Sequence, residues 1–206
     1  MDKKLQYIKS LYPNAKCELH YQTLFQLLIA VVLSAQTTDV RVNQVTANLF
    51  KKYPDAKTLK NAPLDEIEML IKAIGMYKVK AKNIIQIAKD IDEKFQGEVP
   101  NDVEKLLTLP GVGNKTINVV LAEGFKIPAF PVDTHVNRIA KRLQYASLED
   151  NVEEVEAKLK KVIEKEEWIQ MHHSLIFFGR YFCKAKQPNC KECQLQNGCI
   201  KEYKVK

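Results

Sequence analysis

The densest group of reactive side chains in the sequence is a set of four cysteines near its C-terminal end. Cys183, Cys190, Cys193 and Cys199 follow the spacing Cys-x6-Cys-x2-Cys-x5-Cys, so one compact loop can bring four thiolates to a single centre. Four cysteines suit either a zinc ion or an iron–sulfur cluster. The spacing matches neither the usual zinc patterns nor the usual ferredoxin patterns. The residues themselves therefore predict a metal centre and leave the metal open.

A second group with chemical potential surrounds a glycine-containing turn. Residues 101–124 are predicted to form a short helix, the turn Leu109-Pro110-Gly111-Val112-Gly113, and a second helix that begins near Asn114. Gly111 and Gly113 can adopt backbone dihedrals closed to other residues, and they place no side chain between the turn and a ligand. The amides of the turn and of the second helix can then face one phosphate. The unit resembles a helix-hairpin-helix, which grips the DNA backbone without reading sequence; an ordinary αα-hairpin turn is the alternative.

One lysine in this unit is unusual for its position. Lys115 falls in the first turn of the second predicted helix, where the positive end of the helix dipole disfavours an ammonium ion. Partial burial would further favour the neutral amine, which can attack carbon as a Schiff-base nucleophile. A contact to phosphate from the same turn would also tolerate this position. The position of Lys115 therefore leaves both roles open.

An aspartate lies at the start of the next predicted helix. In Pro131-Val132-Asp133-Thr134-His135, either Asp133 or Thr134 can cap the helix that follows. Capping alone would explain an aspartate at this position, without any catalytic role. The two roles of Asp133 are compatible if one carboxylate oxygen caps the helix and the other faces a pocket.

The elements that must position these groups are predicted to be helices throughout. Apolar residues recur at helical spacing in almost every segment, and no comparable stretch alternates with period two, so the fold class is all-α. Two helix starts are marked by capping boxes, Asn101 with Glu104 and Asn151 with Glu154. His172 and His173 fall on a helix predicted from about Trp168 to Phe182, where packing is expected of them. No internal repeat or flexible linker is visible.

Composition sets the broad class of protein. The 206 residues are 46% apolar and carry a net charge of +7, which allows a real core and one large or two small domains. A positive charge suits a polyanionic partner but is common in proteins that bind none. The most apolar run, Leu24 to Leu33, contains Gln26 and is far shorter than the roughly 20 residues of a membrane span, so it is predicted to be a buried helix.

Cellular location bears on how the cysteines are used. The sequence begins Met1-Asp2-Lys3-Lys4-Leu5, without an apolar signal core, so a cytoplasmic location is expected. In such a protein a cysteine cluster favours metal over disulfides. Cys17 stands alone and is expected to be a small buried apolar residue.

Several motifs together resemble the endonuclease III family. The hairpin continues as Leu109-Pro110-Gly111-Val112-Gly113-Asn114-Lys115-Thr116, Val132-Asp133-Thr134-His135 follows, and the cysteine array comes after it. The resemblance runs nearly end to end. It also takes in Leu33-Ser34-Ala35-Gln36-Thr37-Thr38-Asp39, Ile74-Gly75-Met76-Tyr77, and His172-His173 before Gly179-Arg180.

The resemblance implies the helix-hairpin-helix DNA glycosylase fold, with two helical domains flanking a DNA-binding groove. One domain is expected over residues 22–131 and contains the hairpin. The other is expected over residues 1–21 and 132–206 and contains an iron–sulfur cluster loop at 183–199. Because this cysteine spacing is the family's 4Fe-4S signature, the resemblance favours that cluster over zinc, with a structural and DNA-docking role.

The resemblance also implies an activity. The chain is expected to be a base-excision repair glycosylase that removes damaged bases, oxidised pyrimidines first among them, from duplex DNA. It would also act at abasic sites as a lyase, cleaving the strand by β-elimination through a lysine Schiff base. It is expected to act as a monomer and without a membrane.

Site residues follow from the resemblance position by position. Lys115 would attack the sugar C1′, and Asp133 would stabilise positive charge at that carbon. Gln36 and Met76 would fill the gap left by a flipped nucleotide, while Ser34 and Asp39 are candidates for reading the base. The remaining DNA contacts are expected at Gly111, Gly113, Lys184, Lys186 and Lys191, although lysines of a loop such as 183–199 can also be merely solvated.

Two departures and two alternatives accompany this interpretation. Asn114 stands where a basic residue is frequent in the family, and Ser174 stands where a tryptophan is expected. A monofunctional mismatch or adenine glycosylase shares the fold and cluster but lacks a lysine at position 115. A non-catalytic DNA-binding module would use only the hairpin and would leave Lys115 and Asp133 together unexplained.

Overall fold

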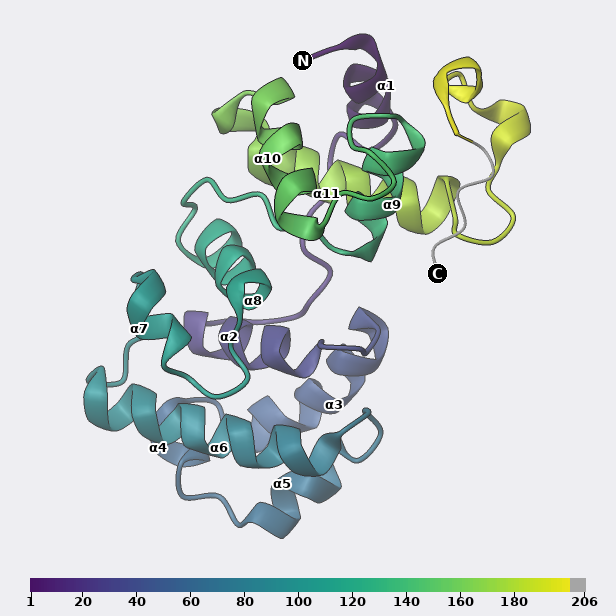
Figure 1. The fold of residues 1–206 in the computed structure, drawn as a ribbon. Coiled ribbons are helices and arrows are strands. Elements are labelled where there is room, and N and C mark those ends of the chain that lie inside the picture. The colour runs from purple at the N-terminus through teal and green to yellow at the C-terminus, as the bar shows by residue number, and fades with distance from the viewer. Residues whose placement is uncertain (201–206) are drawn as a thin grey trace. The chain divides into compact units, whose positions relative to one another are not determined.

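The computed structural model describes residues 1–200, and every regular element in this range is helical. The all-α prediction is confirmed. The chain divides into two compact units (Figure 1). We call Glu18–Lys126 the hairpin unit and Met1–Cys17 with the chain from Ile127 onward the cysteine unit. The divisions at 18 and 126 come a few residues before the domain boundaries expected at 22 and 131.

The hairpin unit is built around one apolar helix. Helix α2 (Leu24–Leu33) begins at the N-cap Thr23, whose side chain accepts a hydrogen bond from the amide of Gln26, and every residue of α2 after Leu24 is buried. This burial on all sides explains why the run is apolar except for Gln26, and the predicted buried helix is confirmed. The other elements are α3 (Asp39–Lys52), α4 (Ala56–Leu59), α5 (Leu64–Ile71), α6 (Tyr77–Lys94), α7 (Val103–Leu107), α8 (Asn114–Val119) and the π-helix η1 (Val120–Gly124).

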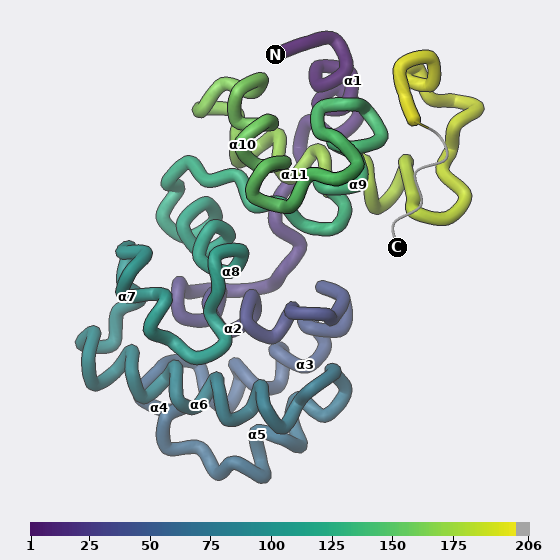
Figure 2. Tube along the Cα trace, in the orientation of Figure 1, coloured from purple at the N-terminus to yellow at the C-terminus, as the bar shows by residue number. Residues whose placement is uncertain are grey.

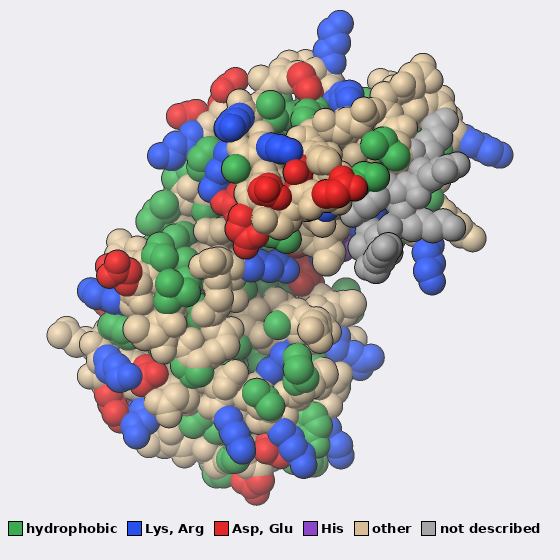
Figure 3. Space-filling model, in the orientation of Figure 1, with side chains coloured by type: hydrophobic (Ala, Val, Ile, Leu, Met, Phe, Trp, Pro, Cys, Tyr) green, Lys and Arg blue, Asp and Glu red, His purple; other side chains and the backbone are tan. Residues whose placement is uncertain are grey.

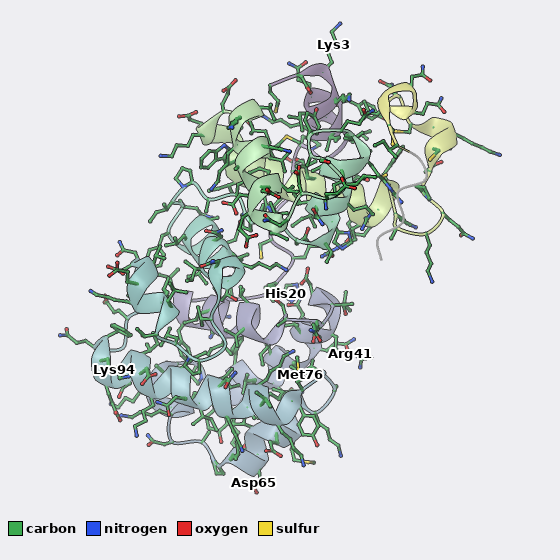
Figure 4. The ribbon with its side chains drawn as sticks, in the orientation of Figure 1. Lys3, His20, Arg41, Asp65, Met76 and Lys94 are labelled. Carbon is green, nitrogen blue, oxygen red and sulfur yellow. The ribbon has the colours of Figure 1, made fainter. Side chains whose placement is uncertain are left out.

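Helix α6 is the longest element of this unit and runs along several others. It packs against α2, α4 and α5 (Figure 1). Figure 4 labels Met76 and Lys94 at its two ends. Ala81, Ile84, Ile87 and Ile91 recur at helical spacing and are completely buried, so this stripe fixes the rotation of α6 about its axis.

One of the two predicted capping boxes is wrong. Helix α7 begins at Val103, and its N-cap is Asp102, whose carboxylate accepts a hydrogen bond of 3.0 Å from the amide of Lys105. An aspartate one residue after Asn101 takes the capping role, and the helix starts one residue later than predicted. The box at the start of α10 is confirmed: the amide of Glu154 donates to Asn151 at 2.9 Å, and the amide of Asn151 donates to Glu154 at 2.8 Å.

The cysteine unit joins two distant parts of the chain in one core. Helix α1 (Lys3–Leu11) lies beside α11 (Trp168–Phe177), as the trace in Figure 2 shows. Leu5 and Ile8 of α1 enter a core that contains Phe130, Met171 and Phe178. The remaining elements are α9 (Thr134–Arg142), α10 (Val152–Val162), the π-helix η3 (Phe178–Phe182) and the short 3-10 turns η2 (Lys165–Glu167), η4 (Cys190–Glu192) and η5 (Gln196–Gly198).

The predicted helix from Trp168 to Phe182 is present as α11 continued by η3. His172 and His173 are both buried on it, and the ring of His172 meets Phe130 edge to face at 6.0 Å. Ser174, which stands at the expected tryptophan position, is fully buried and donates to the carbonyl of Gln170 at 3.0 Å. None of the helices in residues 1–200 is both long enough and apolar enough to cross a membrane.

Candidate nucleic-acid interface and metal centre

Buried apolar side chains hold the hairpin between α7 and α8 in place. Leu106, Leu109 and Val112 are buried, and the amide of Val112 donates to the carbonyl of Leu109 at 3.2 Å. The buried residues hold the turn while its glycines stay exposed. The exposed face of the turn is therefore backbone rather than side chain.

The two glycines of the hairpin differ in conformation. Gly111 has φ +74°, in the region that favours glycine, as predicted. Gly113 has φ −115°, which any residue can adopt, so the predicted need for special dihedrals is wrong there. A Cβ at Gly113 would meet nothing within 4 Å, whereas one at Gly111 would come within 2.7 Å of Asn83 Nδ2. The backbone conformation therefore requires glycine at position 111. At position 113 glycine only keeps the space beside the turn free of a side chain.

Lys115 is the second residue of α8, so the predicted position in the first turn is confirmed. No acidic residue lies in that turn and no side chain caps the helix. Its amide groups are thus not screened by a carboxylate of their own turn. Lys115 itself is exposed, and only Ile117 of α8 is buried.

Gln36 and Met76, the two predicted gap-filling residues, share a strained backbone. Gln36 has φ +54° and Met76 has φ +56°, both in the left-handed region. Both side chains are exposed, and Met76 is 54% exposed despite its apolar side chain. Met76 directly precedes α6, where Figure 4 labels it. The segment that carries Gln36 lies between α2 and α3.

The structure adds a residue that sequence analysis did not single out. Lys80 on α6 is only 4% exposed, and its Nζ donates to Leu33 O at 2.9 Å, Ala35 O at 2.7 Å and Thr37 Oγ1 at 3.1 Å. Burial lowers the pKa of this lysine. A signal existed in the sequence, because positions 80, 84, 87 and 91 follow helical spacing and place a lysine on an otherwise apolar stripe.

The candidates for reading the base lie near the same segment. Ser34 is the C-cap of α2, and its hydroxyl donates to the carbonyl of Val31 at 2.8 Å. Asp39 is the first residue of α3, which Thr38 caps. Both are half-buried. The Ser34 hydroxyl already donates its proton to the helix, so toward a ligand it could act only as an acceptor.

Asp133 caps α9 in the cysteine unit. The amide of Val136 donates to Asp133 Oδ1 at 2.8 Å, which confirms the predicted capping role. Within residues 1–200, the other carboxylate oxygen, Oδ2, takes part in no hydrogen bond. The neighbouring His135 has its pKa lowered chiefly by burial, against the opposing effect of the Asp133 charge. The cap therefore fixes the carboxylate and leaves one oxygen available.

The cysteine array forms a loop after η3. All four thiols are half-buried, and three of them, Cys183, Cys193 and Cys199, pack against the core of the unit. Burial raises the pKa of the Cys193 and Cys199 thiols, and the other cysteines of the array raise it further. Among the described side chains, none of the histidine, cysteine and acidic groups forms a cluster of three or more that could hold a metal ion. Cys17 is also half-buried, so its expected full burial is wrong.

Two buried arginines of α9 fasten the start of this loop. Arg138 donates to Gly179 O at 2.6 Å and to Cys183 O at 3.3 Å. Arg142 donates to Lys184 O at 2.8 Å and to the Cys183 sulfur at 3.3 Å. Gly179 leaves room for this packing, because a Cβ there would lie 2.9 Å from His135 Cβ. Sequence analysis did not single out these arginines, since their spacing is that of an ordinary helix.

Basic side chains are dispersed over the surface. Lys184, Lys186 and Lys191 are exposed, as expected of residues between the cysteines. On the face drawn in Figure 3, the lysines and arginines of the hairpin unit lie among acidic and apolar side chains rather than in one patch. On this face, the lysines and arginines of the hairpin unit therefore form no single charged patch.

Comparisons with known proteins agree with this geometry. The family model described as HhH-GPD superfamily base excision DNA repair protein matches residues 29–165. The chain is 49% identical to "Endonuclease III" of Bacillus subtilis (strain 168) over 195 residues, which cover 95% of this chain and 89% of that protein.

Two solved structures are also similar throughout. "Structure of a Trapped Endonuclease III-DNA Covalent Intermediate: Estranged-Adenine Complex" superposes with a TM-score of 0.92 at 49% identity, over 96% of this chain and 92% of that one. "Structure of a non-covalent Endonuclease III-DNA Complex" superposes with a TM-score of 0.93 at 48% identity, over the same shares of the two chains. The similarity therefore covers both units.

Proposed function

The chain belongs to the endonuclease III family of base-excision DNA repair enzymes, which are glycosylases with lyase activity, and from this premise we propose that Lys115 is its nucleophile. The observation that carries the proposal is the place of Lys115, exposed in the first turn of α8 directly after the hairpin. If the hairpin amides hold the phosphate backbone, this amine lies next to the sugars of the same strand. Oxidised pyrimidines in duplex DNA are the proposed substrates.

The proposed reaction first removes the base and then cleaves the strand. The neutral amine of Lys115 forms a bond to C1′ of the damaged nucleotide, and the base departs with the electrons of the glycosidic bond and takes up a proton. Opening of the sugar ring gives an imine between Lys115 and the deoxyribose. Loss of a proton from C2′ then expels the 3′ phosphate by β-elimination, and hydrolysis of the imine returns the enzyme.

Asp133 is proposed to stabilise positive charge at C1′ during base loss. Its cap to Val136 fixes the carboxylate and leaves Oδ2 for the substrate. A carboxylate beside an amine favours the ammonium form, so Asp133 would not serve Lys115 by activating it through charge. Asp133 could instead act on the sugar, directly or through a water molecule, without favouring the ammonium form of Lys115.

Base removal requires that the nucleotide leave the duplex. Extrusion costs a few kcal/mol and is least costly at a damaged base. Gln36 and Met76 are proposed to occupy the void, because both side chains are exposed and come from backbone held in the left-handed region. Ser34 and Asp39 are proposed to contact the extruded base. Gly111 and Gly113 are proposed to contact phosphates, as are the lysines of the array, Lys184, Lys186 and Lys191.

We further propose that the cysteine array holds a 4Fe-4S cluster. Four thiols from one loop are a complete donor set for such a cluster, and Arg142 already donates to the Cys183 sulfur. When bound, the cluster supplies iron–thiolate bonds that hold Cys183, Cys190, Cys193 and Cys199 together. The proposed chemistry at C1′ does not pass through it. A cytoplasmic monomer that associates with the nucleoid is the proposed cellular form.

Borohydride trapping tests the nucleophile. Lys115→Gln keeps a similar stem but cannot form an imine, so trapping on duplexes with an abasic site should disappear while binding to the duplex is largely kept. Lys105→Gln, an exposed lysine on the other helix of the hairpin, is the matched control and should trap normally. Trapping by Lys115→Gln at the level of the unaltered protein would assign the nucleophile to another amine. An unaltered protein that excises bases and never traps would belong with monofunctional glycosylases.

Asp133→Asn tests the second role separately. Asparagine is as good an N-cap as aspartate, so α9 should keep its start while the charge is lost. Base excision should fall by about 100-fold or more, as for loss of one preorganised charge-stabilising group. Trapping on a pre-formed abasic site should partly survive, because no base has to leave. Asp102→Asn, the same change at the cap of α7, should leave both activities unchanged.

A further inference from the structure

Lys80 is a buried lysine whose donors are all used. Its side chain lies within the hairpin unit, and lysines are almost never fully buried unless they are paired. An ammonium group has three protons to donate, and three acceptors stand within 3.1 Å of Nζ. A residue needed only to fill space on the apolar stripe of α6 would be served by leucine or methionine. The three acceptors, rather than the burial, therefore call for a lysine.

The acceptors belong to the segment that carries Gln36. Leu33 O and Ala35 O are backbone carbonyls, and the third acceptor is the Thr37 hydroxyl. The carbonyl of Ala35 is part of the peptide unit that joins Ala35 to Gln36. Holding this carbonyl fixes the plane of that peptide unit, and the torsion from this plane to the Gln36 Cα is the φ angle of Gln36.

The φ angle of Gln36 is the one that the surrounding structure must stabilise. A φ of +54° is unfavourable for a residue other than glycine, and such a conformation persists only where its surroundings fix it. On the other side of Gln36, the amide of Thr37 donates to Ser34 O at 3.0 Å and closes the turn. The ammonium of Lys80 and this turn together hold both peptide planes that flank Gln36.

The same lysine is tied to the second gap-filling residue. The backbone amide of Lys80 donates to the carbonyl of Met76 at 3.0 Å, in the first turn of α6. This is the first backbone hydrogen bond of α6, and it joins the N-cap Met76 to the fourth residue of the helix. The side chain of Lys80 thus fixes the segment of Gln36 from the helical turn that directly follows Met76.

We propose that Lys80 is a positioning residue for base extrusion, which holds Gln36 in its left-handed conformation and in register with Met76 so that both enter the duplex as a preformed pair. The inference rests on the proposed gap-filling role of Gln36. Preorganisation matters because a side chain that must first adopt an unfavourable backbone conformation loses part of its binding free energy to ordering. Lys80 touches no DNA in this account.

A double-mutant cycle tests the inference, with excision rates measured under single-turnover conditions on a duplex with a base-paired lesion. Lys80→Met keeps the stem and removes all three donors. It should lower base excision about tenfold, a modest part of the few kcal/mol that extrusion costs. Cleavage of a pre-formed abasic site, where no base has to be unstacked, should change by less than about twofold. Lys89→Met removes the same charge from an exposed position of α6 and should change neither rate.

The cycle is completed with Gln36→Ala. If Lys80 acts through Gln36, adding Lys80→Met to Gln36→Ala should lower excision by less than about twofold further. Effects that simply multiply would overturn the inference and leave the proposed function intact. If Gln36→Ala alone does not slow excision, its gap-filling role is wrong and the positioning role of Lys80 falls with it.

A second variant guards against misfolding of Lys80→Met. Thr37→Val removes one of the three acceptors and keeps the side-chain shape. It should slow excision in the same direction by a smaller factor, again only when Gln36 is present, with an unchanged melting temperature. An equal effect of Thr37→Val with and without Gln36 would contradict the inference.

Discussion

The hairpin and the cysteine loop are held in place in different ways. In the hairpin, Leu106, Leu109 and Val112 are buried beneath the turn, so apolar packing fixes the backbone that faces outward. In the cysteine loop, no residue from 183 to 200 is buried, and its regular structure consists of two three-residue turns. The hairpin turn thus buries side chains of its own, whereas the loop only lies against the core of its unit.

Polar contacts hold both ends of the cysteine loop. Arg142 donates to carbonyls at its start, among them Lys184 O at 2.8 Å. Near its end, Lys4 of α1 donates to Gly198 O at 3.4 Å, and the amide of Ile200 donates to Arg142 O at 2.8 Å. Between these points the amide of Asn189 donates to Phe182 O at 3.1 Å, and Cys193 and Leu195 pack against the core of the unit. We therefore infer that local sequence encodes the hairpin, whereas the loop is completed by the proposed cluster.

Loss of one cysteine of the array should give the largest effect. We expect Cys193→Ser to prevent assembly of the cluster, so the protein should lose the broad visible absorption of an iron–sulfur centre and the amides of the loop should exchange without protection. Amides of the hairpin around Val112 should keep their protection, because apolar residues hold that turn. Hydrogen exchange followed by mass spectrometry measures both regions in one sample.

Cys17→Ser is the matched control for this experiment. Cys17 lies outside the array and is half-buried like the others, so its replacement should leave both colour and loop protection unchanged. A colourless, active protein with stoichiometric zinc would contradict the proposed cluster. Equal loss of protection in loop and hairpin would contradict the contrast between the two regions.

An intermediate effect is expected at the hairpin glycines, where Gly111→Ala and Gly113→Ala form a pair. Alanine at 111 must adopt φ +74°, so the free energy of unfolding should fall by about 1 kcal/mol. Alanine at 113 fits φ −115° in open space and should cause no loss. Denaturant unfolding measures both values.

Duplex binding should separate the two glycines differently. Gly113→Ala should weaken binding although its stability is kept, because the new methyl group faces the ligand. Gly111→Ala should lower both the stability of the fold and the affinity for duplex DNA. Unchanged affinity of a stable Gly113→Ala protein would argue that phosphate is not bound at this turn.

The smallest effect, on stability alone, should come from a contact in the cysteine unit that does not involve the array. The hydroxyl of Tyr145 donates to both oxygens of Asp2 at 2.7 and 2.8 Å. Burial, followed by this hydrogen bond, raises the pKa of Tyr145 above its ordinary value of 10.0. Tyr145→Phe should lower the free energy of unfolding by about 1 kcal/mol near neutral pH.

The pH dependence of this contact has a definite sign. Because the folded-state pKa is raised, the contribution of Tyr145 is fully present below the unfolded pKa and is lost as the pH rises toward the folded value. The stability difference between the unaltered protein and Tyr145→Phe should therefore shrink between about pH 8 and about pH 11. A difference that grows over this interval would contradict the assignment.

Much of the fold and part of the site could be predicted from the sequence. The buried helix α2, the position of Lys115 and the capping role of Asp133 follow from local patterns, and each is present in the structure. The errors concern single positions, and one arose where neighbouring residues compete. Asp102 took the cap assigned to Asn101, and Gly113 adopts a φ of −115° that any residue can reach.

Lys80 and Arg142 could not be assigned a role from local patterns. Each donates to backbone carbonyls far away in the sequence, and a carbonyl has no signature in the identity of its residue. The lysine on the apolar stripe of α6 indicated that something unusual lay there, but only the tertiary structure shows its three acceptors.

Mapping of the trapped adduct identifies the nucleophile itself. The unaltered protein is reduced with borohydride on a duplex that contains an abasic site, digested, and analysed by peptide mass spectrometry. We expect the reduced deoxyribose adduct on the peptide that contains Lys115, and on that side chain. An adduct on another lysine or on the N-terminal amine would contradict this assignment.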